Sequence, residues 1–290
     1  MITSFIIIGV VLLVYVSAGF VTSIAWTRND IADVMWGPGV FIAALTALLA
    51  SGDTVSTTPL AYLICGFIFL WAARLALQIG SRFLSKSQED ARYAAWRKSW
   101  SFFYLRSYLQ VFLLQGLLMI LVAMVAVAAT MYRDGTNYQH TMVFVGCLVF
   151  GFGFAFEALA DAQLNAFVKT KTGKAEILTS GLWRYSRHPN YFGEVTTWWG
   201  LWIVAIAPAL ADPTSENLAI ALIALISPVT ITILILKVSG IPMLEAKYVG
   251  NEEFEAYKQR TSAFFPWFPE PAKTPARATP QPGKSPGSST

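Results

Sequence analysis

The sequence predicts an all-α, polytopic integral membrane protein, a helical bundle of about seven transmembrane helices. The chain has 290 residues, of which 55% are hydrophobic and only 13% are charged. Such a chain has too few polar side chains to cover a soluble domain of this size. Its apolar residues also gather in runs of about 20, the length that crosses a bilayer as a helix. Of the 21 Lys and Arg residues, all but Arg74 and Arg133 fall on one side of these runs.

The apolar runs define seven expected spans. They cover residues 2–26, 34–51, 59–80, 108–131, 141–165, 191–211 and 217–238. Because positive loops stay in the cytoplasm, the N-terminus is expected outside and the C-terminus inside the cell. Met1–Phe5 carry no positive charge and the first run is too long for a signal h-region, so the first helix is expected to stay.

One membrane-embedded domain, residues 1–269, and a disordered tail, residues 270–290, are expected, because Pro, Ser, Thr and Ala dominate the tail. Cys65 and Cys147 lie inside spans without metal or disulfide spacing, which indicates packing. With two histidines and no cysteine cluster, no metal site is expected. The net charge of +4 follows from topology and does not indicate nucleic-acid binding.

Two carboxylates stand at the entrance of the second span. Asp30 and Asp33 are three residues apart and can share a helix face. They can be solvated caps at the membrane edge. Alternatively, a desolvated carboxyl beside a second one stays protonated and can donate to a substrate carbonyl.

The third span contains a charge. Arg74 is expected to face the bundle interior or an aqueous cavity together with a partner, as intramembrane charges generally do. The alternative is that it snorkels to the interface, near Arg82. The charged segment Glu89–Lys98 then forms a helical cytoplasmic connection to the fourth span.

A polar stripe marks the fifth span. Glu157, Asp161 and Asn165 recur at every fourth residue, and Lys169 continues the series. Unpaired carboxylates at that depth are costly, so these side chains must meet cations, water or a polar ligand. A purely structural ion pair remains the alternative.

The segment Ser180–Glu194 is polar and cationic between two apolar runs. Pro189 suits the first helical position, which makes His188 the expected N-cap. Arg184 and Arg187 add charge at this helix entrance and predict a site for anions. The alternative is that the arginines only mark a cytoplasmic membrane boundary. Asn190, Glu194 and Trp198 then share one face of the helix that follows.

These residues carry a resemblance. Gly181-Leu-Trp-Arg-Tyr-Ser-Arg-His-Pro-Asn-Tyr-Phe-Gly-Glu194 resembles the C-terminal signature of the membrane steroid 5α-reductase family, especially its bacterial branch. Arg187-His-Pro189 with a later Glu is also similar to isoprenylcysteine carboxyl methyltransferases and membrane sterol reductases. Asp33-Val-Met-Trp-Gly37 is similar to an Asp/Trp motif of the bacterial branch.

The resemblance implies NADPH-dependent reduction of a carbon–carbon double bond conjugated to a ketone in a steroid-like lipid. It implies hydride transfer to the β-carbon with acid assistance at the carbonyl, in a monomer that takes its substrate from the bilayer. The substrate pocket would lie mainly in spans one to four, and the cofactor site mainly in spans five to seven and the cytoplasmic loops.

Site residues follow from the motifs and the resemblance together. The catalytic candidates are Asp33, Asp30 and Tyr93, and Asp33 and Trp36 are the substrate-binding candidates. The cofactor-binding candidates are Arg74, Arg82, Arg92, Glu157, Asp161, Asn165, Lys169, Arg184, Tyr185, Arg187, His188, Asn190, Tyr191, Glu194, Glu245 and Tyr248.

Two alternatives stay open. One is an S-adenosylmethionine-dependent isoprenylcysteine-type methyltransferase, although a sulfonium cofactor needs carboxylates more than the clustered arginines seen here. The other is a transporter or non-catalytic lipid-binding protein, in which Arg74, Glu157 and Asp161 would line a path. No inverted repeat is evident in the sequence, which disfavours the transporter.

Overall fold

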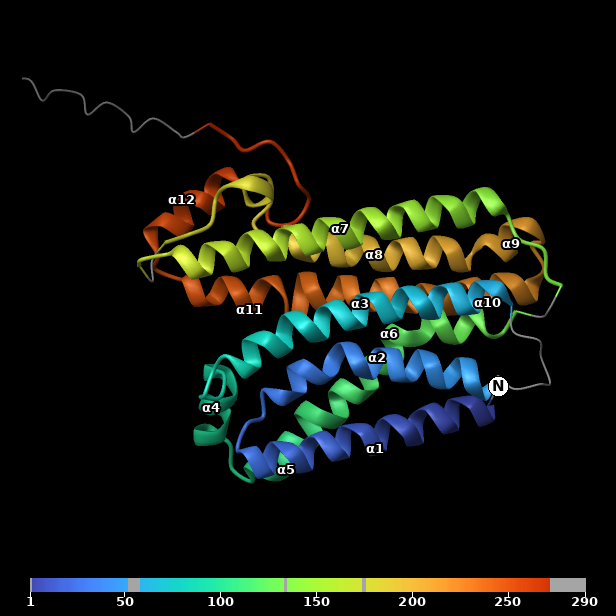
Figure 1. Cartoon of the computed structure of the whole chain (residues 1–290), viewed down its shortest axis with the longest axis horizontal. Helices are drawn as coiled ribbons and strands as arrows, with labels where there is room; N and C mark the ends of the chain where they lie inside the picture. Colours follow the sequence, from blue (N-terminus) through green and yellow to red (C-terminus); the bar gives the residue numbers. More distant parts are fainter. Residues whose placement is uncertain (1, 52–57, 133–134, 174–175, 272–290) are drawn as a thin grey trace, which may run out of the picture.

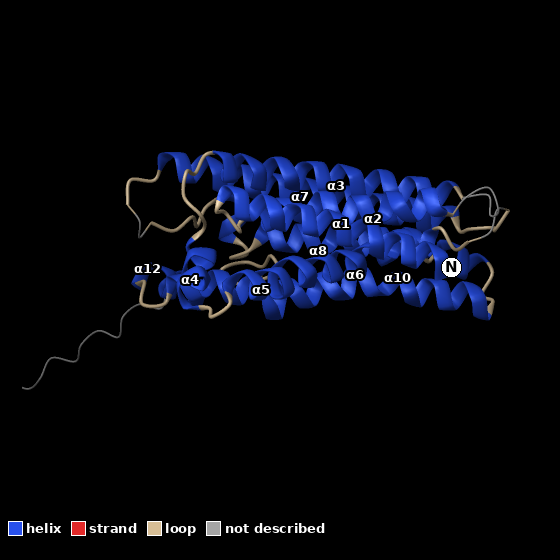
Figure 2. Ribbon diagram, turned by 90° about the horizontal axis from the view of Figure 1, so that it is seen from below, coloured by secondary structure: helices blue, strands red, loops and turns tan. Residues whose placement is uncertain are grey.

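The computed structural model describes residues 2–51, 58–132, 135–173 and 176–271. All regular secondary structure in these ranges is helical, and the long helices lie side by side along the long axis of the molecule (Figures 1 and 2). The expected all-α bundle is therefore confirmed. Most of the expected tail, residues 272–290, lies outside the described ranges.

Six helical runs in the described residues are long and apolar enough to cross a membrane. They are α1 (Ile2–Trp26), α2 (Ile31–Ala50), α3 (Pro59–Leu84), the run Phe103–Ala129, α7 (His140–Thr170) and the run Ser215–Tyr248. The fourth run joins α5 (Phe103–Ser107), η1 (Tyr108–Leu113) and α6 (Leu114–Ala129). The last run joins α10 (Ser215–Ile233), η3 (Leu234–Val238), α11 (Ile241–Glu245) and η4 (Ala246–Tyr248).

The sixth expected span, residues 191–211, forms a shorter helix than the others. Helix α8 (Pro189–Ala205) has 17 residues and is followed directly by α9 (Ala207–Ala211), and the two together are still shorter than the neighbouring α7, which has 31 residues. The start of α1 and the C-terminal segment lie at opposite ends of the bundle (Figure 1).

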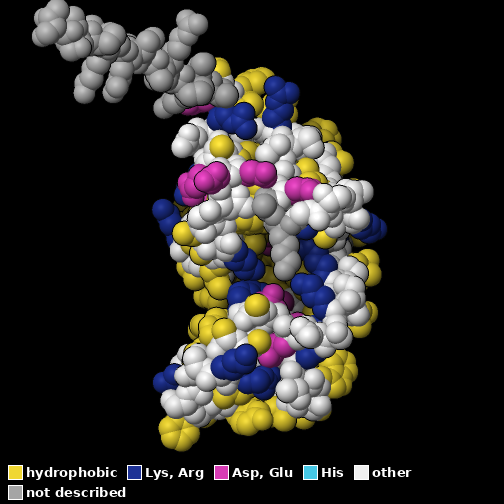
Figure 3. Space-filling view, turned by 90° about the vertical axis from the view of Figure 1, so that its left-hand side faces the viewer, with side chains coloured by type: hydrophobic (Ala, Val, Ile, Leu, Met, Phe, Trp, Pro, Cys, Tyr) yellow, Lys and Arg dark blue, Asp and Glu magenta, His cyan; other side chains and the backbone are white. Residues whose placement is uncertain are grey.

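The end that holds the C-terminal segment carries the short elements. It includes α4 (Ala91–Ser99), η2 (Gly181–Arg184) and α12 (Glu252–Arg260), and we call it the cationic end. Figure 3 looks onto it and shows Lys and Arg side chains gathered there, with carboxylates among them. The orientation inferred from charge, with this end in the cytoplasm, stays a prediction.

Helices α7 and α8 approach each other through glycines. Gly146 faces Gly200, and Gly153 faces Gly193, and a Cβ on any of the four would clash with backbone atoms of the other helix. Gly153 thus packs against α8, whereas Gly151 faces open space. This contact brings the acidic end of α7 against the first turns of α8.

Candidate functional site

A buried ion-pair cluster links α3 to α7. Nη1 of Arg74 donates to Oδ2 of Asp161 at 2.8 Å, and Nη2 of Arg74 pairs with Glu157. Both carboxylates are buried, with Glu157 only 2% exposed. Arg74 therefore has the interior partners expected of an intramembrane charge, and does not snorkel to the interface.

The same two helices meet again toward the cationic end. Asn165 on α7 donates to Oε1 of Gln78 at 2.8 Å, and Arg82 donates to Oδ1 of Asn165 at 2.9 Å. Arg74, Gln78 and Arg82 thus form a polar stripe on α3, with the same spacing of four residues as the stripe on α7. The sequence analysis missed Gln78, although this spacing was visible.

A cavity of about 260 Å³ lies between the two stripes. It is lined by Arg74, Leu77, Gln78, Ala158, Asp161, Ala162 and Asn165. The carboxylate of Asp161 and the amide of Asn165 therefore border this cavity in addition to contacting their own hydrogen-bond partners. This space can admit a polar ligand.

The first turns of α8 complete the cluster. His188 is the N-cap and Pro189 stands in the first turn, as expected from the sequence. Nδ2 of Asn190 donates to Oδ1 of Asp161 at 3.2 Å, and the charge of Glu194 acts on Arg74. Three carboxylates, those of Glu157, Asp161 and Glu194, therefore surround a single guanidinium.

Several buried polar atoms in this cluster have no partner among the described residues. They are Nε1 of Trp71, Nε1 of Trp198, Nε of Arg74, Oε2 of Glu157 and Oδ1 of Asn190. The two indole rings meet edge to face at 5.0 Å, one turn from Arg74 and Glu194. Because buried polar groups nearly always have hydrogen-bond partners, three donors and two acceptors gathered here indicate a place for a polar ligand.

A second cluster joins α2 to α4. The hydroxyl of Tyr93 donates to Oδ1 of Asp33 at 2.6 Å, and Nη2 of Arg92 donates to Oδ2 of Asp33 at 2.8 Å. Arg92 also pairs with Asp90 at 2.9 Å. Burial, together with the negative charge of Asp33, holds the pKa of Tyr93 well above its usual range. Tyr93 is therefore protonated at neutral pH and serves as a donor.

The two candidate carboxylates at the start of α2 have different roles. Asp30 pairs with Arg28 at 2.8 Å and accepts the backbone N–H of Asp90, so it fixes the connection between helices. Asp33 is the one beside Tyr93. Trp36 is half-buried one turn further on and packs against the hydrophobic core.

Tyr191 lies between the two clusters. Its hydroxyl lies within electrostatic reach of Arg82 and Arg92 as well as of Asp161 and Glu194. Charged residues of both the α2/α4 cluster and the α3/α7/α8 cluster therefore act on Tyr191.

Arg187, one of the two arginines of the segment Ser180–Glu194, is hydrogen-bonded to the C-terminal part of the chain. Nε of Arg187 donates to Oε1 of Glu245 at 2.9 Å, and Nη1 donates to the carbonyl of Thr261 at 2.6 Å. Nε2 of His188 lies 3.0 Å from the same Glu245 oxygen. These contacts tie the entrance of α8 to the C-terminal segment, so the role of Arg187 in this structure is to hold the chain together.

Other predicted cofactor contacts lie at the surface of the cationic end. Arg184 is exposed, with its guanidinium 5.9 Å from the ring of Tyr185, and Lys169 is exposed at the end of α7. Neither cation pairs with a carboxylate in the described part of the chain. Tyr248 stacks on Phe254, with ring centroids 4.7 Å apart. Arg184 and Lys169, together with Arg82, which bonds the neutral amide of Asn165, are thus the cations of the predicted set that pair with no carboxylate among the described residues.

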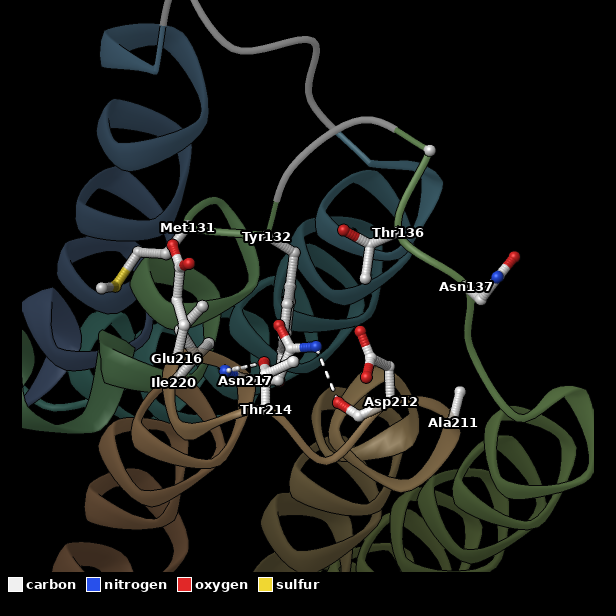
Figure 4. A pocket seen from close by; sticks show the side chains of 11 residues that line it. Met131, Tyr132, Thr136, Asn137, Ala211, Asp212, Thr214, Glu216, Asn217 and Ile220 are labelled. Carbon is white, nitrogen blue, oxygen red and sulfur yellow. Dashed lines mark hydrogen bonds between the residues drawn. The ribbon is translucent and has the colours of Figure 1, made fainter.

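A larger cavity, of about 500 Å³, lies at the opposite end of the bundle (Figure 4). Asn217 donates to the carbonyl of Asp212 at 2.8 Å and to Oγ1 of Thr214 through its backbone, which caps the start of α10. None of the predicted site residues lines this cavity.

We predict that His188, at the entrance of α8, makes the stability of the fold depend on pH. Burial lowers the pKa of His188 below its ordinary value, and its hydrogen bond with Glu245 offsets only part of this effect. Its neutral form is therefore favoured by folding. This contribution to stability is complete above about pH 6.5, the unfolded value, and is lost as the pH falls toward the lowered folded pKa.

The expected result is a lower thermal midpoint at pH 5.5 than at pH 7.5, and a smaller difference between the two in His188→Gln. His140→Gln, at the start of α7, is the matched control and should keep the wild-type difference. An unchanged pH response in His188→Gln would contradict the prediction.

The model of the family described as "Protein of unknown function (DUF1295)" matches residues 19–261 of the chain, which include both clusters. No curated protein and no solved structure matches the chain.

Proposed function

The chain belongs to the DUF1295 family, and from this premise and its two polar clusters we propose that it is an NADPH-dependent membrane reductase of the steroid 5α-reductase type. It would reduce a carbon–carbon double bond conjugated to a ketone in a steroid-like lipid. The family's association with steroid 5α-reductase-like membrane proteins supports this proposal. The observation that carries it is the pairing of the buried Tyr93 with Asp33, together with the buried polar atoms around Arg74 that have no partner among the described residues.

The Tyr93–Asp33 pair suits the polarisation of an enone. As charge develops on the carbonyl oxygen, a preorganised donor in a dry site stabilises it. Tyr93 has one hydroxyl proton, and it now donates to Asp33. For Tyr93 to donate to a substrate carbonyl, a protonated Asp33 must donate to the Tyr93 oxygen in turn. A proton then passes from Asp33 through Tyr93 to the carbonyl oxygen, which would give an enol. When a proton from water reaches the α-carbon, the enol O–H proton returns through Tyr93 to Asp33, so one hydride and one proton are added in total.

The α3/α7/α8 cluster fits the polar end of a nicotinamide nucleotide. A carboxamide or a ribose hydroxyl both donates and accepts, as the unpartnered atoms of Glu157, Asn190 and Trp198 require. Arg184 and Lys169, which are exposed and unpaired with carboxylates, would meet the phosphates. When bound, the reduced nicotinamide supplies a hydride to the β-carbon of the enone.

The remaining predicted contacts divide in two within this proposal. Arg82, Arg92, Asn165 and Tyr191 would contact the ligand directly. Arg187, His188 and Glu245 hold one another, so they would act by positioning the entrance of α8.

One observation favours a second candidate. Three carboxylates around the single guanidinium of Arg74 make the inner cluster acidic, which suits a sulfonium. An S-adenosylmethionine-dependent methyltransferase is therefore the alternative.

Ligand-induced stabilisation separates the two candidates. A cofactor that binds only the folded state at 100 times its Kd stabilises that state by about 2.7 kcal/mol. We expect NADPH, but not S-adenosylmethionine, to raise the thermal midpoint of the full-length protein in lipid nanodiscs. Asp161→Asn should reduce the shift, whereas Asp212→Asn, at the opposite end, should not. A shift with S-adenosylmethionine alone would replace the reductase by the methyltransferase.

A further inference from the structure

A C-terminal segment is fastened to the loop before α8 by its backbone. We call residues 261–268 the latch. The backbone N–H of Arg187 donates to the carbonyl of Ser262 at 2.9 Å, and that of Trp267 donates to the carbonyl of Tyr185 at 2.8 Å. Oγ of Ser186 donates to the carbonyl of Phe264 at 2.9 Å. The latch therefore covers the entrance of α8.

The latch turns large aromatic side chains outward. Phe264 is buried against the bundle, but Phe265, Trp267 and Phe268 are 68%, 72% and 78% exposed. Three large aromatic rings within four residues form a contiguous apolar surface, and such a surface marks an interaction site. All three rings stay largely exposed among the described residues.

An aromatic ladder connects this surface to the lipid-facing side of the bundle. Phe152 contacts Phe156 on α7 at 5.5 Å between centroids, Phe156 contacts Phe192 on α8 at 5.4 Å, and Phe192 contacts Phe265 at 5.9 Å. Phe152 belongs to a row of exposed apolar residues on α7. The row also includes Phe144, Leu148 and Leu159. The surface that faces the hydrocarbon therefore continues, ring by ring, onto the latch.

Positive charges accompany the exposed rings. Lys258 and Arg260 are exposed in the last turn of α12, immediately before the latch, and Arg184 is exposed beside Tyr185, whose ring meets Phe268 at 5.9 Å. Aromatic rings next to Lys and Arg are typical of segments that lie at the boundary between hydrocarbon and lipid headgroups.

We propose that Phe265, Trp267 and Phe268 insert into the bilayer interface and that the latch is held between lipid on one side and the 181–188 loop on the other. The membrane then stabilises the closed entrance of α8 through a surface that is separate from both polar clusters. This proposal stands whether or not the protein is a reductase.

A spin label at position 267 tests insertion. In a Cys65→Ala, Cys147→Ala background, we would label Trp267→Cys and, as a control, Glu253→Cys, which is exposed on α12. In nanodiscs of phosphatidylcholine with phosphatidylglycerol, we expect the label at 267 to collide several times more with oxygen than with a water-soluble nickel complex. The label at 253 should favour nickel. A label at 267 that favours nickel as strongly would overturn the proposal.

Hydrogen exchange tests whether insertion holds the latch. The triple variant Phe265→Ser, Trp267→Ser, Phe268→Ser should speed exchange of the Arg187 amide by about tenfold in nanodiscs. Val249→Ser, which is 82% exposed and lies outside the aromatic ladder, should leave that rate unchanged. An unchanged Arg187 rate in the triple variant would show that lipid contact does not hold the latch, and would overturn that part of the proposal.

Discussion

Replacing Tyr93 with phenylalanine is expected to lower kcat for enone reduction by about a hundredfold or more, the usual loss when a positioned proton donor is removed. The ring stays in place because Tyr93 is 3% exposed and packs edge to face on Trp96. Only the hydroxyl that reaches Asp33 is lost. The measurement is kcat and KM for a 3-oxo-Δ4 steroid with NADPH in nanodiscs, together with NADPH binding.

Two variants make this result specific. Tyr104→Phe removes the same atom from a ring that is 57% exposed on α5, and should keep wild-type kcat. Asp33→Asn leaves an acceptor for Tyr93 but removes the acid and the charge that pairs with Arg92, so kcat should again fall with NADPH binding retained. Wild-type kcat in Tyr93→Phe would refute the assignment of the donor.

The fold was largely predictable because hydrocarbon thickness fixes the length of an apolar run. The seven expected spans all correspond to helices, including the shorter α8 with α9. The residues at which the helices end were less predictable. Helix α7 continues to Thr170 and α3 to Leu84, since polar side chains on both helices pair with each other past the apolar stretch.

Local sequence patterns predicted which side chains share a helix face, but not which residues on other helices they contact. The spacing of Glu157, Asp161 and Asn165 indicated one polar face, and Pro189 indicated a helix entrance, and both lie as expected. Which residue meets which could not be read from a pattern. Asp33 and Tyr93 are 60 residues apart, and their contact depends on how α4 folds back over α2.

The positive charge of the signature segment shows the same limit. Sequence reasoning grouped Arg184 and Arg187 as equal phosphate contacts. The structure separates them, because the carbonyls of the C-terminal segment and Glu245 occupy Arg187 and leave Arg184 exposed. Backbone carbonyls leave no trace in a sequence, so the sequence alone could not distinguish Arg184 from Arg187.

Replacing Arg74 with methionine is expected to cause the largest loss of stability, about 3–5 kcal/mol, because breaking a buried ion pair leaves its partner charge uncompensated. Methionine keeps an apolar stem, so packing changes little. Glu157 and Asp161 would lose their guanidinium while Glu194 remains close by. The measurement is the free energy of unfolding in mixed micelles, or the thermal midpoint.

Neutralising the carboxylate of Glu157, which Arg74→Met leaves without its guanidinium, should restore part of the lost stability. The double variant Arg74→Met, Glu157→Gln is expected to be more stable than Arg74→Met alone, because one buried carboxylate is neutralised. Arg82→Met is the matched control, since Arg82 bonds only the neutral amide of Asn165 near the surface and should cost little. If Arg74→Met were as stable as Arg82→Met, the inner carboxylates would have another counter-charge. This result would contradict the acidic character inferred for the α3/α7/α8 cluster. It would also remove the argument for a sulfonium ligand.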